Sequence, residues 1–292
     1  MTKTLLVTGA QGQLGSELRL LSPKHPDLSF TFIGRDDIDL SQPEAIQAYF
    51  KDKTFDVIIN CAAYTAVDKA ESEPALAKSI NADAVEVLAS IAKEKNSAII
   101  HISTDYVFDG KNYRPYLETD KNDPQSVYGQ TKLEGEQALQ NINPPKSLII
   151  RTSWVYSSFG TNFVKTMLRL GKERESLGVI FDQVGTPTYA RDLAHAILTL
   201  VENPQLYALT ATEIVHYSNE GVCSWYDFAT TLFELSGQTC QVNPIETKDY
   251  PTPATRPHYS LLNKTKIKQQ FGISIPYWKE SLAECLSLLK PS

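Results

Sequence analysis

The most chemically specific pattern in the sequence is a tyrosine followed four residues later by a lysine, in Tyr128-Gly129-Gln130-Thr131-Lys132. Residues at positions i and i+4 lie on the same face of a helix. A phenol has a reference pKa near ~10 and is a slow acid or base at neutral pH, but a nearby ammonium stabilises its phenolate form. The pair therefore predicts proton transfer to a substrate oxygen, and a helix-surface pair without chemistry is the alternative.

A hydroxyl group follows an apolar run about 25 residues earlier, in Ser103-Thr104-Asp105-Tyr106. A serine or threonine at this position could hydrogen-bond a substrate carbonyl and help to place the reacting carbon. The sequence does not decide between Ser103 and Thr104. About twenty residues without a convincing helix or strand then separate Asp105 from Ser126, and long irregular connections of this kind tend to line sites.

The elements that must position these groups alternate regularly in the first half of the chain. Short runs that are apolar throughout suit buried parallel strands, and the segments between them have helical spacing. This alternation predicts βαβ crossovers and a doubly wound parallel sheet, the Rossmann α/β fold. The expected strands are 5–8, 30–33, 55–60, 98–102 and 148–152, and the expected helices are 13–21, 43–50, 74–95 and 127–139.

The regular alternation of apolar runs and helical segments ends after Trp154, and we predict a smaller C-terminal α/β domain that binds substrate. The expected dinucleotide-binding domain comprises residues 1–155 and 188–218, and the substrate domain comprises 156–187 and 219–292. Helices are expected at 162–170, 190–201, 225–235 and 278–289, and strands at 179–181 and 213–217.

A glycine-rich turn follows the first expected strand, with Gly9, Gly12 and Gly15 in the pattern GxxGxxG. Glycine fits the tight turn and lets backbone N–H groups approach a pyrophosphate at the positive end of the next helix. The position at the start of a βαβ series favours a dinucleotide over a turn that only packs a strand against a helix. Because ligands bind beyond the carboxyl ends of parallel strands, the residues after each strand should share one edge.

The end of the second strand bears on the choice of cofactor. Many NAD-binding sites carry an acidic residue here for the ribose 2′-hydroxyl, whereas this chain has Arg35 followed by Asp36 and Asp37. A guanidinium favours a 2′-phosphate and the carboxylates oppose it. We therefore predict NADPH, with NADH as the alternative cofactor and a solvated surface charge as the alternative role of Arg35.

Two further residues are candidate substrate contacts. Trp154 follows the fifth strand, where it could form a platform for a sugar or a base, or pack as a core aromatic. Arg256 stands among prolines in Pro253-Ala254-Thr255-Arg256-Pro257 and could anchor a ligand phosphate. A surface salt bridge is the alternative for Arg256.

Composition and charge exclude several classes of protein. The 292 residues are 42% hydrophobic, but no apolar run approaches the ~18 residues that a membrane span needs. Twenty-eight Lys and Arg against 34 Asp and Glu give a net charge of −6, which disfavours nucleic acid as a partner. Four scattered cysteines and the lack of a secretory signal favour the cytoplasm. The five histidines show no paired spacing, so we expect packing or surface roles for them and no metal site.

Taken together, these residues resemble the extended short-chain dehydrogenase/reductases and, within them, the dTDP-4-dehydrorhamnose reductase family. The similarity extends over nearly the whole chain. It includes the segments GAQGQLG (9–15), NCAAYTAVDKAE (60–71), STDYVFDG (103–110), YGQTKLEGE (128–136), RTSWVY (151–156), NFVKTML (162–168), DQVGTPT (182–188) and PTPATRP (251–257).

The resemblance implies roles for individual residues. It makes Thr104, Tyr128 and Lys132 the catalytic set, and it makes Thr104, Asp105 and Trp154 the contacts to a nucleotide sugar. The expected surroundings of the cofactor are Gly9, Gln11, Gly12, Gln13, Leu14, Gly15, Arg35, Asp39, Leu40, Ala62, Ala63, Tyr64, Thr65, Tyr128 and Lys132.

The implied reaction is hydride transfer from NADPH or NADH to the 4-keto group of dTDP-4-dehydro-L-rhamnose. Some family members are magnesium-bridged dimers, but the sequence shows no convincing acidic cluster, so magnesium dependence and a homodimer both stay open. Two alternatives remain: a sugar-nucleotide epimerase or dehydratase of the same fold, and a non-catalytic regulatory subunit like the beta subunit of methionine adenosyltransferase.

Overall fold

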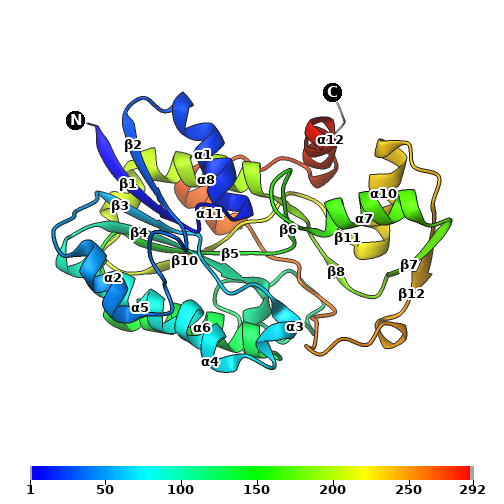
Figure 1. Ribbon diagram of the computed structural model, residues 1–292, viewed down its shortest axis with the longest axis horizontal. Coiled ribbons are helices and arrows are strands. Elements are labelled where there is room, and N and C mark those ends of the chain that lie inside the picture. Colours follow the sequence, from blue (N-terminus) through cyan, green and yellow to red (C-terminus); the bar gives the residue numbers. More distant parts are fainter. Residues whose placement is uncertain (1, 290–292) are drawn as a thin grey trace.

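A six-stranded parallel sheet forms the larger part of the molecule (Figure 1). The computed structural model describes residues 2–289. The strand order is β10-β5-β4-β3-β1-β2, so the first strand lies inside the sheet and the chain winds outward from it in both directions. The strands are β1 (Lys3–Thr8), β2 (Leu28–Ile33), β3 (Val57–Asn60), β4 (Ala98–Thr104), β5 (Ser147–Thr152) and β10 (Glu213–His216). The predicted doubly wound fold is thereby confirmed.

Helices cover both faces of this sheet (Figure 1). One layer contains α1 (Gln13–Leu21), α8 (Ala190–Glu202) and α11 (Thr265–Phe271), which pack with the sheet in one hydrophobic cluster. The other contains α2 (Pro43–Phe50), α5 (Ala84–Glu94) and α6 (Val127–Ile142). All four residues of β3 are buried because both faces are covered, which is why the expected strands read as continuous apolar runs.

The helix expected over 74–95 is interrupted. It forms α4 (Pro74–Lys78), a π-helical turn η2 (Ser79–Asp83) and then α5. In that turn the Asn81 side chain accepts a hydrogen bond from Tyr64 N at 2.8 Å and donates one to Thr131 Oγ1 at 3.1 Å. A Cβ on Gly135 of α6 would lie only 2.1 Å from the backbone carbonyl oxygen of Asn81. The wider turn therefore brings Asn81 against α6 and against the loop after β3, a contact that helical periodicity does not encode.

Short strands and helices form the smaller part, on the right of Figure 1. The second hydrophobic cluster of the protein lies in this part and includes Tyr156, Phe228 and Trp278. The elements here are β6 (Val155–Tyr156), α7 (Phe163–Glu173), β7 (Ser176–Ile180), β8 (Val184–Gly185), β9 (Thr188–Tyr189), β11 (Cys223–Ser224), α10 (Trp225–Ser236), β12 (Gln241–Ile245) and α12 (Trp278–Leu289). We retain the two-domain division as a proposal, with α11 on the side of the sheet because Ile267 and Phe271 pack in the first cluster.

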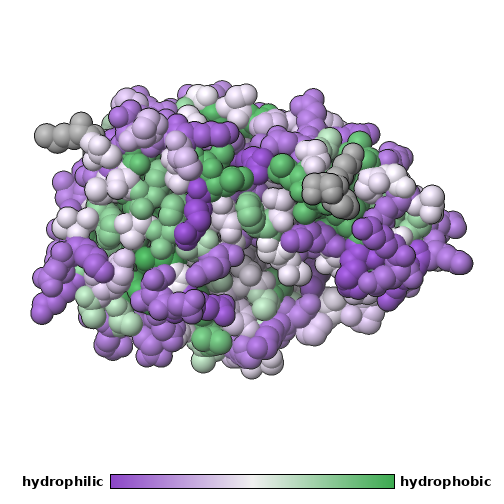
Figure 2. All heavy atoms as spheres, turned by 45° about the horizontal axis from the view of Figure 1, so that its top comes forward, coloured by the Kyte–Doolittle hydropathy of each residue, from purple (hydrophilic) through white to green (hydrophobic). Residues whose placement is uncertain are grey.

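The remaining elements are short connections. They are α3 (Val67–Ala70), α9 (Pro204–Ala208) and the 3-10 turns η1 (Ser22–Lys24), η3 (Asp105–Val107) and η4 (Thr247–Asp249). On the face drawn in Figure 2, hydrophilic side chains surround smaller hydrophobic areas. Exposed large hydrophobic residues such as Leu20, Tyr113 and Phe181 come from separate elements. Among residues 2–289, no helix is long and apolar enough to cross a membrane.

Candidate active site

The glycine-rich turn lies between β1 and α1. Two of its glycines are in close contact with other protein atoms, and the third has space beside it. Gly9 has a φ of +68°, and a Cβ there would lie 2.8 Å from the Ala62 nitrogen. A Cβ on Gly15 would lie 2.3 Å from the Gly9 oxygen. Protein packing therefore requires both glycines. A Cβ on Gly12 would meet only the Gly9 oxygen, at 3.1 Å, and Gly12 is exposed at the N-cap of α1. The space beside Gly12 and the positive end of α1 suit a pyrophosphate.

Other residues expected around the cofactor differ in what they can offer. The Leu14 side chain is buried in the core, and the Tyr64 hydroxyl is directed to Glu73, to which it donates at 2.6 Å. At these two positions only the backbone is free to face a ligand. Gln13 is held by contacts to the smaller part of the molecule, because Asn162 Nδ2 donates to its Oε1 at 2.9 Å.

The end of β2 is open to solvent. Arg35 and Asp39 are both exposed. Ser41 donates to Asp39 Oδ1 from its hydroxyl and its backbone N–H, and these hydrogen bonds lower the pKa of Asp39. Asp39 is thus an oriented carboxylate and Arg35 an unburied guanidinium at the same edge. This pair of opposite charges is compatible with a ribose hydroxyl or with a 2′-phosphate.

A tight contact brings the start of α6 onto the residues after β4. Ser126 caps the helix by accepting from Gly129 N at 3.2 Å. A Cβ on Gly129 would lie 2.3 Å from the Tyr106 carbonyl oxygen, so only glycine permits this approach. As a result the Tyr106 and Tyr128 rings meet edge to face, with centroids 5.4 Å apart. This contact brings Tyr128 close to Thr104.

Tyr128 and Thr104 interact directly. Burial raises the pKa of Tyr128 to about 12, hydrogen bonding with Thr104 opposes the rise, and the Asp105 charge adds to it. Thr104 Oγ1 also accepts from Tyr106 N at 3.2 Å and lies 3.1 Å from Asp105 Oδ1. Because the phenol keeps its proton across the physiological range, Tyr128 is suited to donate a proton.

Lys132 lies one turn further along α6 and is only 1% exposed. Its Nζ donates to the Ile102 carbonyl oxygen at 2.7 Å and lies 3.2 Å from His101 Nε2. Burial lowers the pKa of Lys132 to about 8, and Glu136 acts in the opposite direction. The contact with His101 was missed from the sequence, because the five histidines show no spacing that links one of them to a lysine.

The structure distinguishes the two hydroxyl candidates at the end of β4. Ser103 Oγ donates to Glu136 Oε1 at 2.5 Å, and Arg151 holds the same carboxylate in a buried ion pair with an N–O distance of 2.6 Å. Successive side chains of a strand point to opposite faces, so Ser103 is committed to this pair while Thr104 faces Tyr128. Thr104 is therefore the hydroxyl available to a substrate.

Asp105 follows Thr104 and is 3% exposed. Among residues 2–289 its Oδ2 has no hydrogen-bond partner at ordinary geometry, but the Ser260 hydroxyl lies near enough to lower its pKa. Burial raises the pKa of Asp105 to about 6. An unpartnered buried acceptor is costly, and its position beside Thr104 suits a hydroxyl group of a substrate.

Trp154 adopts a φ of +50° at the end of β5. Its ring stacks on Trp225 at the start of α10, with centroids 3.7 Å apart and planes 13° apart. A Cβ on Gly185 would lie 3.0 Å from the Trp154 ring, so glycine is needed behind it. Trp154 thus packs at the edge of the second hydrophobic cluster, as the core-aromatic alternative expected, and its role as a platform for a ligand stays a proposal. Trp225 was missed because the two tryptophans are 71 positions apart in the chain.

Arg256 makes a two-pronged ion pair with Asp68. Both of its terminal nitrogens donate to the Asp68 carboxylate at 2.8 Å. Asp68 also accepts from Ala254 N at 3.2 Å, and these contacts lower its pKa. The salt bridge that we gave as the alternative is therefore present, and a role of Arg256 as a phosphate anchor stays a proposal.

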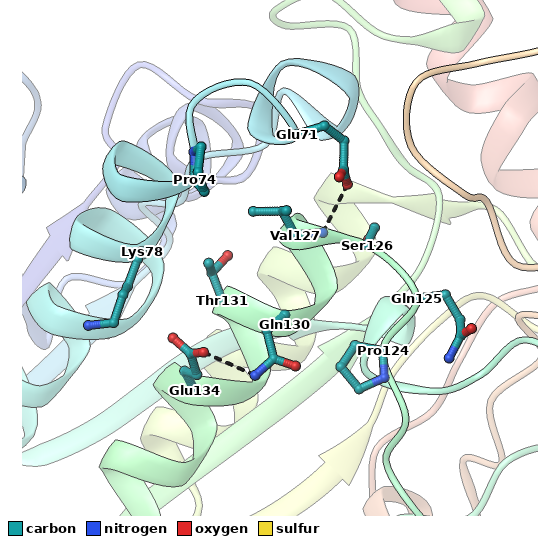
Figure 3. Close-up of a pocket in the computed structure, with 10 residues that line it drawn as sticks. All are labelled: Glu71, Pro74, Lys78, Pro124, Gln125, Ser126, Val127, Gln130, Thr131 and Glu134. Carbon is teal, nitrogen blue, oxygen red and sulfur yellow. Dashed lines mark hydrogen bonds between the residues drawn. The ribbon is translucent and has the colours of Figure 1, made fainter.

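A surface cavity of about 460 Å³ lies beside this site. Figure 3 shows it between α4 and α6, with Glu134 and Gln130 hydrogen-bonded to each other along α6. Neither Tyr128 nor Lys132 lines it. The cavity is therefore distinct from the cluster of Thr104, Tyr128 and Lys132, and no residue predicted from the sequence belongs to it. Among residues 2–289 no group of His, Cys, Asp or Glu side chains could hold a metal ion.

The doubly wound sheet, the glycine-rich turn and the Tyr–Lys helix define an extended short-chain dehydrogenase/reductase. Comparison with known proteins is consistent with this class. The sequence profile described as the RmlD substrate binding domain matches residues 2–290. A curated dTDP-4-dehydrorhamnose reductase of Escherichia coli (strain K12) is 44% identical over 297 residues, covering 98% of this chain and 97% of the relative.

Solved structures agree with this result. A dTDP-4-dehydrorhamnose reductase from Clostridium acetobutylicum has a TM-score of 0.92 and 42% identity, covering 98% of this chain and 99% of that one. Another, from Bacillus anthracis and in complex with NADP, has a TM-score of 0.91 and 35% identity, covering 99% and 100% of the two chains. The chain belongs to the RmlD substrate binding domain family, as the sequence resemblance predicted.

Proposed function

We propose that the protein is an NAD(P)H-dependent reductase of dTDP-4-dehydro-L-rhamnose that forms dTDP-L-rhamnose. The observation that carries this proposal is the juxtaposition of the partly buried Tyr128 phenol and the buried Thr104 hydroxyl at the carboxyl ends of the sheet. Full-length similarity to curated dTDP-4-dehydrorhamnose reductases supports the choice of substrate.

The residues of the glycine-rich turn fit a dinucleotide. The open space beside Gly12 accommodates phosphate oxygens at the positive end of α1. In this proposal Arg35 and Asp39 contact the adenosine ribose, and Lys132 contacts the nicotinamide ribose. When bound, the reduced cofactor supplies a hydride to the 4-keto carbon of the sugar. The Bacillus anthracis relative bound to NADP supports NADPH, and NADH is the second cofactor that we propose.

The protein side of the reaction is positioning and proton transfer. Thr104 hydrogen-bonds the keto oxygen, and Tyr128 donates its proton to that oxygen as negative charge develops on it. The ammonium of Lys132 favours the resulting phenolate. Asp105 and Trp154 orient the sugar, and Arg256 is the proposed anchor for a phosphate once a ligand competes with Asp68.

The test is an absorbance assay of NADPH, and then NADH, with the 4-keto sugar nucleotide made in situ by an upstream dehydratase and epimerase. Wild type should consume cofactor. Tyr128→Phe should bind NADPH with unchanged affinity but lose at least ~100-fold in kcat, the lower end for a general acid. Tyr113→Phe, at an 89% exposed position, is the matched control and should match wild type. Near-normal turnover of Tyr128→Phe would refute the assignment of the proton donor.

The two alternatives give different results in the same assay. An epimerase or dehydratase would purify with bound NAD and show no net consumption of NADPH. A regulatory subunit would show no turnover and would co-purify with a methionine adenosyltransferase. A homodimer and a cytoplasmic location stay predictions, and light scattering of the purified protein tests the first.

A further inference from the structure

A buried chain of polar side chains leads from the first strand to Lys132. Thr8 Oγ1 lies 2.6 Å from Asn60 Oδ1 at the ends of β1 and β3. Asn60 Nδ2 lies 3.0 Å from His101 Nδ1, and His101 Nε2 lies 3.2 Å from Lys132 Nζ. Thr8 and His101 are 0% exposed, Lys132 is 1% exposed and Asn60 is 2% exposed. No part of the proposed mechanism uses Thr8, Asn60 or His101.

One end of the chain favours one direction for its hydrogen bonds. The Ala62 backbone N–H donates to Thr8 Oγ1 at 3.1 Å, and an amide N–H can only donate. Thr8 then has its own proton for Asn60 Oδ1, so Asn60 presents its NH₂ group to His101 Nδ1. A neutral imidazole that accepts at Nδ1 carries its proton at Nε2. That proton points toward Lys132.

His101 stays neutral in this setting. Burial lowers the pKa of His101 well below its usual value. The Nε2–H group needs an acceptor, and an uncharged lysine amine offers a lone pair whereas an ammonium offers none. For Lys132 to carry a charge and still bond to His101, the imidazole must change its tautomer and the Asn60 amide must turn over.

Burial and Glu136 are what shift the pKa of Lys132, whereas Asp105 of η3, which also packs against α6, acts on Tyr128. Glu136 of α6 acts on Lys132, but its carboxylate is held by Arg151 and Ser103. Tyr128 on the same helix is neutral, because its pKa is raised to about 12. On the elements that pack against α6 from the other side, Asp83 is paired with Lys78 and Glu86 is exposed. His101 is thus the uncompensated partner of Lys132.

We propose that Thr8, Asn60 and His101 are positioning residues that set the charge of Lys132 through the tautomer of the His101 ring. In the free protein the chain moves the protonation equilibrium of Lys132 toward the amine relative to an ordinary lysine, and the acceptor hydroxyls of a bound ribose move it back toward the ammonium. Cofactor binding and protonation of Lys132 are therefore coupled through groups that touch neither substrate nor cofactor. This inference rests on the proposed function, because it takes Lys132 as the residue that holds the ribose.

The experiment measures the dissociation constant of NADPH against pH, from the fluorescence of the cofactor, with the full-length protein. In wild type the affinity should fall tenfold per pH unit above a bend near the Lys132 pKa of about 8. Lys132→Met should bind weakly without a bend. A wild-type profile without a bend, or a bend that persists in Lys132→Met, would overturn the inference.

Two variants at opposite ends of the chain should move the bend in the same direction. His101→Gln can turn a carbonyl oxygen toward Lys132, and Thr8→Val frees Asn60 to offer its oxygen to His101. Each should move the bend upward, by about one pH unit, although Thr8 does not touch Lys132. Thr4→Val, the same substitution earlier on β1 and outside the chain, is the matched control and should leave the bend in place.

If these residues had only a structural role, the substitutions would weaken NADPH binding at every pH and leave the pH of the bend unchanged. A bend that stays or moves downward in both variants would therefore overturn the inference. If His101→Gln does not fold, Thr8→Val carries the test alone. The proposed function fails separately, if wild type does not oxidise NADPH in the presence of the 4-keto sugar nucleotide.

Discussion

Gly129 at the start of α6 lies so close to Tyr106 that a Cβ would come within 2.3 Å of the Tyr106 carbonyl oxygen. This contact sets the distance between α6 and the end of β4, and with it the meeting of Tyr128 and Thr104. Gly129, the second residue of the sequence motif 128–132, thus has a steric role that the motif does not reveal.

Gly129→Ala tests this contact. The backbone oxygen cannot move aside cheaply, so we expect the free energy of unfolding to fall by ~1–3 kcal/mol. Turnover should fall as well, because Tyr128 is displaced from Thr104. Urea unfolding and the NADPH assay measure the two effects. Gln130→Ala at the exposed neighbouring position should change stability by less than ~0.5 kcal/mol. Equal stability of the two variants would contradict the steric argument.

The buried ion pair of Glu136 and Arg151 should be far more sensitive than an exposed one. Glu136→Ala leaves the Arg151 charge buried and unpaired, and we expect a loss of ~3–5 kcal/mol in the free energy of unfolding. Glu173→Ala breaks the exposed pair with Arg169 and should cost less than ~1 kcal/mol. Urea unfolding of both variants gives the comparison, and similar losses would show that burial does not govern the effect.

Arg256 and Asp68 allow the proposed phosphate anchor to be separated from a structural salt bridge. Arg256→Gln should raise the KM for the nucleotide sugar by about tenfold, the loss expected for one charged hydrogen bond. Asp68→Asn removes the competing carboxylate and should leave that KM unchanged or lower it. Steady-state kinetics decides the question. The same rise in KM for both variants would mean that the ion pair only holds the loop after β3 against residues 254–256.

Protonation of Asp105 should lower the activity at acid pH. Its pKa of about 6 means that the carboxylate accepts hydrogen bonds from substrate above pH 6 and is protonated below it. We expect kcat/KM to fall tenfold per pH unit below about pH 6. Asp105→Asn should be less active but should show no such limb. Retention of the acid limb in Asp105→Asn would assign it to another group.

Much of the architecture follows from local sequence. The apolar runs that become β1, β3 and β5 are buried on both faces, so their composition alone indicates parallel strands between helices. The GxxGxxG turn needs glycine at 15 because of a backbone contact with Gly9 within one βαβ unit. The spacing of Tyr128 and Lys132 is a property of a single helix. These features depend on neighbours in the chain, and a pattern can therefore predict them.

Contacts between distant elements had to come from the tertiary structure. The choice of Thr104 over Ser103 depends on Glu136 and Arg151, which are brought in by α6 and β5. The stacking of Trp154 on Trp225 joins two parts of the fold that the sequence keeps apart. The contact of His101 with Lys132 arises because β4 and α6 pack in one register. The charge of a buried side chain is set by whichever groups surround it in space, and the order of residues in the chain does not specify them.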